Sequence, residues 1–358
     1  MSHPVLHTRL CDLLGVQYPI VQTGMGWVAG PSLTSATSNA GGLGILAAAT
    51  MSFDELKAAV AEVKSRTDKP FGVNIRADAP DAAQRIDLII REDVKVASFA
   101  QAPNREFIKK LKDSGRVVIP SIGAKRHAEK VAEWGVDAVL VQGGEGGGHT
   151  GSVATTLLLP QVVDTVDIPV VAAGGFFDGR GLVAALAYGA SGIAMGTRFL
   201  LTSDSRVPDA VKAEYLQRTV SDTVVTREVD GQPHRVLRTP LIDRLEHHVP
   251  GSSLVGALRN ALRFHDESGV SYVDMMKEGL AMKKNQELSW SQVIMAANSA
   301  ILTKRALVDG RTDIGVFPTG QVVGVIDDLP TCQELIDRII AEAESVLVTL
   351  SSTSRTKA

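Results

Sequence analysis

The stretch PVVAAGGFFDGRGLVAALAYGASGIAMGTR, residues 169–198, contains the pattern that decides the fold. An apolar run ends in Gly174 and Gly175, an amphipathic segment follows at 178–190, and a second apolar run ends at Gly196. Continuous apolar runs of this length are typical of strands buried on both faces, as in parallel sheets covered by helices. The stretch therefore predicts a β/α/β unit with small residues after each strand.

The same alternation extends through the first two hundred residues. Six further apolar runs precede this unit, and helix-like segments separate them, several of which end at a glycine. The eight expected strands begin at Pro19, Leu43, Phe71, Val96, Val117, Ala138, Pro169 and Gly192. Eight such units predict an α/β fold of the (β/α)8 or TIM-barrel type, in which active sites form from the loops after the strands.

The pattern changes after the eighth strand. We expect residues 1–205 and 301–358 to form the barrel. Residues 206–300, called the lid segment here, are expected to form a smaller, mostly helical domain that binds substrate over the barrel. Its expected helices include residues 254–265 and 271–285.

Composition excludes several classes of protein. The 358 residues include 37 basic and 40 acidic side chains, with a net charge of −3 and no dense basic block, which disfavours nucleic acid or an anionic membrane as a partner. Cys11 and Cys332 are the only cysteines, which excludes a disulfide scaffold and a cysteine-based metal site, and we expect no metal. With no apolar run near ~20 residues and no signal-peptide pattern, we expect a soluble cytoplasmic protein.

A glycine pattern at residues 24–30, GMGWVAG, allows a Rossmann dinucleotide fold as an alternative. That fingerprint requires an acidic residue ~20 positions later to bind a ribose. This chain has AAAT at residues 47–50. We therefore favour the barrel over the Rossmann fold.

The expected strand ends carry most of the unusual small and polar residues. Glycines after the seventh and eighth strands are typical of barrel phosphate sites, so we expect a phosphorylated cofactor. The stretch VQGGEGGGHTG, residues 141–151, places His149 directly after three glycines. Such a run is typical of a loop whose backbone approaches another group closely or takes a positive φ. An imidazole at this position can give or take a proton. The alternative is an imidazole that only hydrogen-bonds a loop carbonyl.

Several of these stretches together resemble the nitronate monooxygenase (2-nitropropane dioxygenase) family, which also includes flavin-dependent enoyl-acyl-carrier-protein reductases. The stretches are residues 19–48, 71–75, 141–151 and 168–205. The likeness runs through the whole barrel, and the combination of motifs at successive strand ends makes it specific. It implies FMN on a (β/α)8 barrel beneath a smaller, mostly helical domain.

The resemblance also implies roles for individual residues. His149 corresponds to the active-site histidine of the family, and Asn74 and Gln142 would hydrogen-bond the flavin. The residues implied for the cofactor are Gly24, Met25, Gly26, Asn74, Gln142, Gly147, Gly174, Gly175, Ala194, Met195, Gly196 and Thr197. Gly320 and Gln321 would lie near the phosphate. Gly146 stands where the family usually has Ala, a small change that leaves flavin binding intact.

Over its length the sequence looks most like an actinobacterial branch associated with breakdown of the last steroid rings, whose substrates are hydrindanone CoA thioesters. We therefore expect an FMN-dependent oxidoreductase that acts on a C–C bond beside a carbonyl in such a thioester. Candidate substrate contacts are Arg76, Glu145, Arg235 and Arg238, with His234 beside the last two. The plain alternatives are a surface pair of Arg76 with Asp78 or Asp81, a loop-bracing Glu145, and ordinary surface charge for the rest.

Two other functions stay open at this point. Nitronate monooxygenase acting with oxygen is the alternative enzyme, and a non-catalytic flavin-binding protein is the alternative outside catalysis. The intact histidine motif disfavours the second. The sequence leaves open the direction of reaction, whether NAD(P) as co-substrate or oxygen meets the reduced flavin, and whether the protein forms a homodimer.

Overall fold

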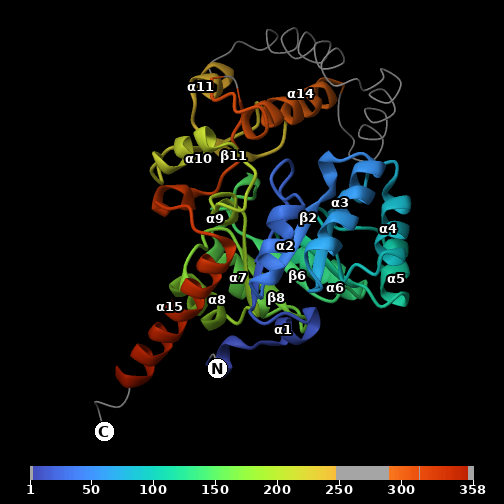
Figure 1. Cartoon of the computed structure of the whole chain (residues 1–358), viewed down its shortest axis with the longest axis vertical. Helices are drawn as coiled ribbons and strands as arrows, with labels where there is room; N and C mark the ends of the chain where they lie inside the picture. Colours follow the sequence, from blue (N-terminus) through green and yellow to red (C-terminus); the bar gives the residue numbers. More distant parts are fainter. Residues whose placement is uncertain (1–2, 247–289, 314, 354–358) are drawn as a thin grey trace.

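The computed structural model describes residues 3–246, 290–313 and 315–353. It shows a barrel surrounded by helices, with further elements stacked over one end (Figure 1). The helices expected at 254–265 and 271–285 lie outside the described residues. Among the described helices, none is both long enough and apolar enough to cross a membrane.

Eight parallel strands form a closed barrel in the order β1-β2-β3-β4-β5-β6-β8-β9. They are β1 (Ile20–Gln22), β2 (Leu43–Ala47), β3 (Phe71–Ile75), β4 (Val96–Phe99), β5 (Val117–Ile122), β6 (Val139–Gln142), β8 (Val170–Ala173) and β9 (Gly192–Met195). The barrel closes where β1 pairs with β9, with Ile20 beside Ile193 and Val21 beside Ala194. The predicted (β/α)8 barrel is confirmed, and each expected apolar run supplies one strand.

Helices surround the barrel, and all but the last of them connect two barrel strands. They are α2 (Pro31–Asn39), α3 (Phe53–Arg66), α4 (Ala82–Arg91), α5 (Arg105–Asp113), α6 (Lys125–Glu133), α7 (Thr155–Val163), α8 (Gly179–Ala187) and α9 (Thr197–Leu200). Local sequence sets some helix starts: α3 begins with a capping box in which Ser52 and Glu55 bond each other's backbone N–H groups.

The first helix, α1 (Arg9–Leu14), lies before β1 and packs against the barrel interior. Its Leu10, Cys11 and Leu14 belong to one buried apolar cluster with inward-facing strand residues. The helix lies below the barrel, at the end opposite the lid segment (Figure 1). The carboxyl ends of the strands are therefore the end left for a ligand site. Both cysteines, Cys11 and Cys332, are buried and free.

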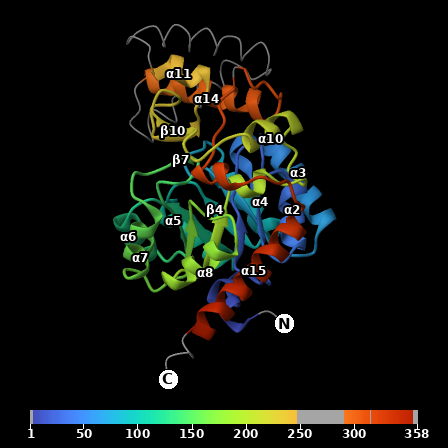
Figure 2. The same cartoon turned by 90° about the vertical axis from the view of Figure 1, so that its left-hand side faces the viewer.

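The last helix, α15 (Cys332–Thr353), lies against α8 and α2 and extends past the barrel (Figure 2). Its contact with α8 requires a glycine, because a Cβ on Gly179 would collide with the backbone of Ile339 and Ala343. The described part of the C-terminal region, helix α15, therefore packs against the outside of the barrel.

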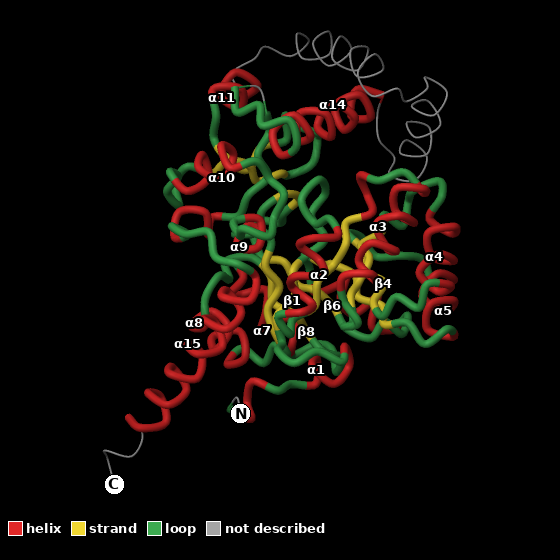
Figure 3. Tube along the Cα trace, in the orientation of Figure 1, coloured by secondary structure: helices red, strands yellow, loops and turns green. Residues whose placement is uncertain are grey.

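The lid segment contains more than helices. Its described elements are α10 (Asp209–Leu216), β10 (Thr223–Thr226), β11 (His234–Leu237), α11 (Pro240–Glu246) and α14 (Trp290–Leu307). β10 and β11 pair antiparallel, and β11 also pairs with β7 (Gly148–His149) in the barrel loop after β6. Short strand segments, yellow in Figure 3, therefore lie among the helices and loops over the barrel. Sequence analysis missed this sheet because its strands have two to four residues and lie in turn-rich sequence. α14 also crosses the boundary expected at residue 300, and the division into domains stays a prediction.

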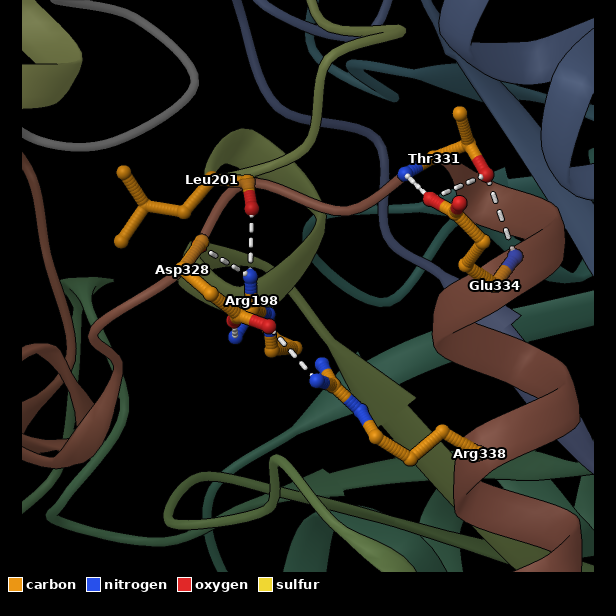
Figure 4. A network of polar contacts seen from close by, with 6 residues as sticks. All are labelled: Arg198, Leu201, Asp328, Thr331, Glu334 and Arg338. Atoms are coloured by element: carbon orange, nitrogen blue, oxygen red, sulfur yellow. Dashed lines mark hydrogen bonds and ion pairs between the residues drawn. The ribbon is translucent and has the colours of Figure 1, made fainter.

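A buried arginine connects α9 to the segment before α15 (Figure 4). Arg198, with its side chain 3% exposed, donates to Asp328 Oδ1 at 2.8 Å and to the carbonyls of Leu201 and Asp328. Arg338 of α15 donates to the other oxygen of Asp328 at 2.6 Å. Burial alone would raise the pKa of Asp328, but Arg338 and Arg198 hold it below its ordinary value.

Asp328→Asn should lower the free energy of unfolding by about 1–3 kcal/mol near pH 7, because Arg198 keeps two carbonyl acceptors but loses its carboxylate. Urea unfolding measures the change. The matched control is Asp337→Asn, because the Asp337 carboxylate is exposed and accepts a hydrogen bond from Gln333. This control should lower the free energy of unfolding by under about 0.5 kcal/mol. Since the folded-state pKa of Asp328 is lowered, its stabilisation exists above about pH 4 and disappears as the pH falls further. A difference that does not change with pH would contradict this interpretation.

Candidate functional site

A cavity of about 750 Å³ lies at the carboxyl ends of the barrel strands. Its walls include residues from the loops after β1, β3, β6, β8 and β9, together with Ser299, Ala300 and Thr303 of α14. A volume in this range is typical of cofactor and small-molecule sites. The described part of the lid segment therefore forms part of the wall.

Most of the predicted site residues meet in this cavity. Those that line it are Gly24, Met25, Gly26, Asn74, Arg76, Gln142, Glu145, Gly147, His149, Gly174, Gly175, Ala194, Met195, Gly196 and Thr197. Gly320, from the segment before α15, lines it as well, whereas Gln321 lies in the wall of a neighbouring pocket. The barrel thus brings together residues that lie up to about 300 positions apart in the sequence.

The candidate substrate contacts have different surroundings. Arg76 lines the cavity and forms two hydrogen bonds with Asp78, at 3.0 and 3.2 Å. Arg235 does not line it; its guanidinium donates to the carbonyl of Gly144 at 2.8 Å. Arg238 pairs with Asp243 at 2.9 Å, also away from the cavity. Of the three arginines, Arg76 is the one placed to meet a ligand in this cavity.

The glycine run after β6 packs against the chain itself. A Cβ on Gly143 would lie 2.6 Å from Thr155 N, and one on Gly147 would lie 2.5 Å from Gly320 N. Gly148 has a φ of +71°, which side-chain-bearing residues rarely adopt. The run is therefore required where this loop crosses two other backbone segments.

Two polar side chains hold the same loop in place. Gln142 Nε2 donates to the carbonyl of His149 at 2.9 Å. Glu145 accepts hydrogen bonds from Thr155 N at 2.9 Å and Thr155 Oγ1 at 2.7 Å. Thr155 begins α7, whose N-cap, Ala154, has no side chain to cap the helix. Glu145 therefore supplies the missing cap, as its loop-bracing interpretation implied.

The residues at the ends of β8 and β9 fit a phosphorylated group. Gly174 and Gly175 have φ values of +91° and +87°. A Cβ on Gly175 would have no chain atom nearer than 3.8 Å, so glycine there leaves the backbone open to the cavity rather than to a packing neighbour. Thr197 begins α9 and accepts a hydrogen bond from Gly320 N at 2.9 Å through its Oγ1. Exposed backbone at such positions can approach and bind a phosphate closely.

His149 lies in a cluster with one carboxylate and a second histidine. Its Nε2 is 2.8 Å from Asp230 Oδ2, and Nδ1 of His234 is 3.2 Å from the same oxygen. The two imidazole rings stack, with centroids 4.7 Å apart and planes inclined by 29°. The side chains of Asp230 and His234 are 7% exposed, whereas that of His149 is 64% exposed.

The carboxylate of this cluster is held in its charged form. Burial alone would raise the pKa of Asp230, but its contacts with His149 and His234 lower that pKa well below the ordinary value. Asp230 Oδ1 also accepts a hydrogen bond from Gln232 N at 3.1 Å. An ionised Asp230 therefore has both oxygens occupied by donors.

Backbone pairing assembles this cluster. In the antiparallel register of β7 and β11, His149 lies opposite His234, and Thr150 N donates to the carbonyl of Pro233 at 3.1 Å. Asp230 lies in the turn that leads into β11. Sequence analysis missed Asp230, and the only signal was its position four residues before a histidine in the stretch DGQPH.

The closed (β/α)8 barrel places a glycine-lined cavity, with His149 in its wall, at the strand ends, which is where barrel enzymes have their active sites. The chain belongs to the nitronate monooxygenase family, whose model matches residues 7–85 and 81–342.

Two similar proteins cover nearly the whole chain. One, from Rhodococcus jostii (strain RHA1), is 65% identical over 338 residues, which are 94% of this chain and 96% of the relative. The other, from Mycobacterium tuberculosis (strain ATCC 25618 / H37Rv), is 62% identical over 350 residues, 97% and 99% of the two chains. Both are named (3aS,4S,5R,7aS)-5-hydroxy-7a-methyl-1-oxo-octahydro-1H-indene-4-carboxyl-CoA dehydrogenase.

Two further proteins are similar at lower identity, one compared by sequence and one by structure. A probable nitronate monooxygenase of Staphylococcus saprophyticus is 33% identical over 72% of this chain and 87% of its own. Among solved structures, FabK from Thermotoga maritima matches with a TM-score of 0.76 and 35% identity over 97% of this chain and 99% of that chain.

Gly147→Ala should destabilise the loop after β6, because the new methyl group would collide with the backbone at Thr319 and Gly320. We expect a cost of about 1–3 kcal/mol, measured as a lower thermal midpoint, together with a lower cofactor content. Gly151→Ala in the same loop is the control, because its Cβ would have 3.7 Å of clearance. Equal midpoints for the two variants would argue against this packing explanation.

Proposed function

We propose that this protein is an FMN-dependent dehydrogenase that acts on the hydrindanone-type CoA thioester of steroid catabolism for which its two relatives are named. The observation that carries the proposal is His149, whose imidazole lies at the wall of a cofactor-sized cavity and bonds a buried carboxylate. Identity of 62–65% over nearly the whole chain supports the same substrate class.

The named thioester has a bond suited to this chemistry. Its thioester carboxyl is on C4, and the descriptors 3aS and 4S mark C3a and C4 as saturated centres that each carry one hydrogen. The C4 proton is acidified by the thioester carbonyl. Loss of that proton, with departure of the C3a hydrogen as hydride, forms a C=C bond conjugated with the carbonyl. The chain must therefore supply a base beside C4 and a site for a hydride acceptor.

Residues of this chain fit both requirements. When bound, FMN supplies the acceptor for the hydride. The residues proposed to hold it are Gly24, Met25, Gly26, Asn74, Gln142 and Gly147 beside the ring, with Gly174, Gly175, Ala194, Met195, Gly196 and Thr197 toward the phosphate. His149 takes the C4 proton, because it is the exposed member of its cluster and lines the same cavity.

Helix α14 forms part of the wall of this site. Ser299, Ala300 and Thr303 of α14 line the cavity, and the Lys304 ammonium lies 5.7 Å from the centroid of the Trp27 ring. A cation above an aromatic face is attracted by the ring, so this contact holds α14 to the loop after β1. Arg76 is the candidate contact for an anionic part of the substrate.

The likeness to a probable nitronate monooxygenase supports one alternative. Anaerobic mixing of the flavin-loaded protein with each substrate distinguishes the functions. Flavin bleaching by the CoA thioester, with a conjugated thioester as product, supports the proposal. Bleaching by an alkyl nitronate alone supports nitronate monooxygenase, and no bleaching by either supports a non-catalytic flavin-binding protein. A product ketone at C5 would show that the carbinol is oxidised instead.

The purified protein should be yellow and should release FMN, not FAD, on denaturation. The glycines that follow β8 and β9 leave room for the phosphate of FMN. The chain has AAAT at residues 47–50, where a Rossmann fold would have the acidic residue that binds the ribose of an adenine dinucleotide. Chromatography and mass spectrometry of the released flavin check this. A colourless protein that FMN does not reconstitute would remove the basis of the proposal.

His149→Ala should fold and bind FMN but should lose flavin reduction by the thioester about 10²–10⁴-fold, which is the usual contribution of positioned proton transfer. Stopped-flow absorbance measures the rate, and the flavin-to-protein ratio is the control. Near-normal reduction in the flavin-loaded variant would mean that His149 only braces its loop.

A further inference from the structure

The hydrogen bonds of the His149 cluster assign its protons. An ionised carboxylate can only accept, and Asp230 Oδ2 faces Nε2 of His149 at 2.8 Å and Nδ1 of His234 at 3.2 Å. Both of these nitrogens must therefore carry hydrogen. In the neutral ring of His149, Nδ1 is then the nitrogen with a free lone pair. Within the described residues, that nitrogen makes no hydrogen bond.

We propose that Asp230 is the positioning residue that fixes His149 as the Nε2–H tautomer, so that Nδ1 is the atom that receives the substrate proton. This inference rests on the proposed function, which gives His149 the proton transfer. In the step, the C4–H bond breaks, its electron pair forms the C=C bond with C3a, and the C3a hydride leaves to the acceptor that FMN would supply when bound. The proton joins Nδ1, and the resulting imidazolium stays paired with Asp230 across the Nε2–H bond.

The geometry restricts His149 from three sides. The β7–β11 pairing fixes its backbone opposite His234, and the stacked ring of His234 lies against one face of its imidazole. Asp230 then fixes rotation of the ring, because turning it over would exchange Nε2–H for a carbon opposite the carboxylate. Positioning of this kind matters for rate, since proton transfer requires hydrogen-bond geometry between the base and the reacting atom.

The carboxylate itself is held from behind. Gln232 N donates to Oδ1 of Asp230 at 3.1 Å, which leaves Oδ2 for the two imidazoles. In Asp230→Asn, the amide oxygen must face Gln232 N, and the amide NH2 then faces the histidines. An NH2 group donates, so it requires a lone pair on Nε2 of His149 and forces the proton onto Nδ1. The substitution keeps the shape of the side chain at position 230 but changes His149 from the Nε2–H to the Nδ1–H tautomer.

The test compares Asp230→Asn with Asp222→Asn in flavin-loaded protein. Asp222 directly precedes β10, and among the described residues its carboxylate accepts hydrogen bonds from Thr219 alone. Anaerobic reduction at saturating thioester should fall about 10²-fold in Asp230→Asn, with apparent substrate affinity unchanged within about threefold. Asp222→Asn should match the wild type in both. A weaker affinity with an unchanged limiting rate would overturn the proposal, because it indicates a substrate contact.

Tautomers can be read directly from ¹⁵N-histidine NMR spectra of the wild type, with the His149 signal identified by its loss in His149→Ala. The expected form is Nε2–H, changing to Nδ1–H in Asp230→Asn. An Nδ1–H signal in the wild type overturns the proposal even if Asp230→Asn fails to fold. If His149→Ala is inactive while Asp230→Asn is normal, the positioning inference fails and the proposed function stands; if His149→Ala is active, the base assignment itself fails.

The same three side chains place potential metal ligands within 4.8 Å of one another. Metal analysis and chelation of the active protein therefore complete the test. Full activity after chelation, without bound metal, is expected. A stoichiometric metal whose removal abolishes flavin reduction, and whose return restores it, would overturn the tautomer assignment, because a metal replaces the protons on both nitrogens.

Discussion

The pairing of β1 with β9 is the constraint on which the rest of the structure depends. It closes the eight-stranded sheet, with Ile20 beside Ile193, so that the barrel has no edge strand. The strands meet closely here: a Cβ on Gly192 would lie 2.5 Å from the carbonyl oxygen of Pro19, so the closing strand begins with a glycine. Closure places the loops after the first and last strands side by side. The cavity exists because of this contact, since its walls come from loops around the whole ring.

The site also requires segments that are not part of the barrel. His149 comes from the loop after β6, whereas Asp230 and His234 come from the lid segment, and the β7–β11 pairing joins them. The segment at Thr319 and Gly320 then crosses the same loop, close enough that Gly147 has no room for a side chain. Neither the barrel nor the lid segment contains the cluster of His149, Asp230 and His234 by itself. A change in how they pack would therefore alter this cluster before it altered the barrel.

The polar network around Arg198 shows how the end of the chain is fixed to this arrangement. Arg198 follows β9 directly, and its guanidinium bonds both the carboxylate and the carbonyl of Asp328. Arg338 bonds the same carboxylate from α15. A buried guanidinium without a partner is costly, so the segment before α15 is held beside the last strand. That segment carries Gly320 into the cavity wall.

The sequence by itself determined the barrel, because each strand and helix is encoded by a local apolar period and the glycines mark the strand ends. It also indicated His149 and most of the cavity wall, since residues after parallel strands must gather at one end. It did not indicate Asp230 or the lid sheet. Those depend on pairing between residues 148–149 and 234–235, and two-residue strands have no period to detect. Only the tertiary structure decided which nitrogen of His149 faces a carboxylate, because a proton position depends on contacts between residues 81 positions apart.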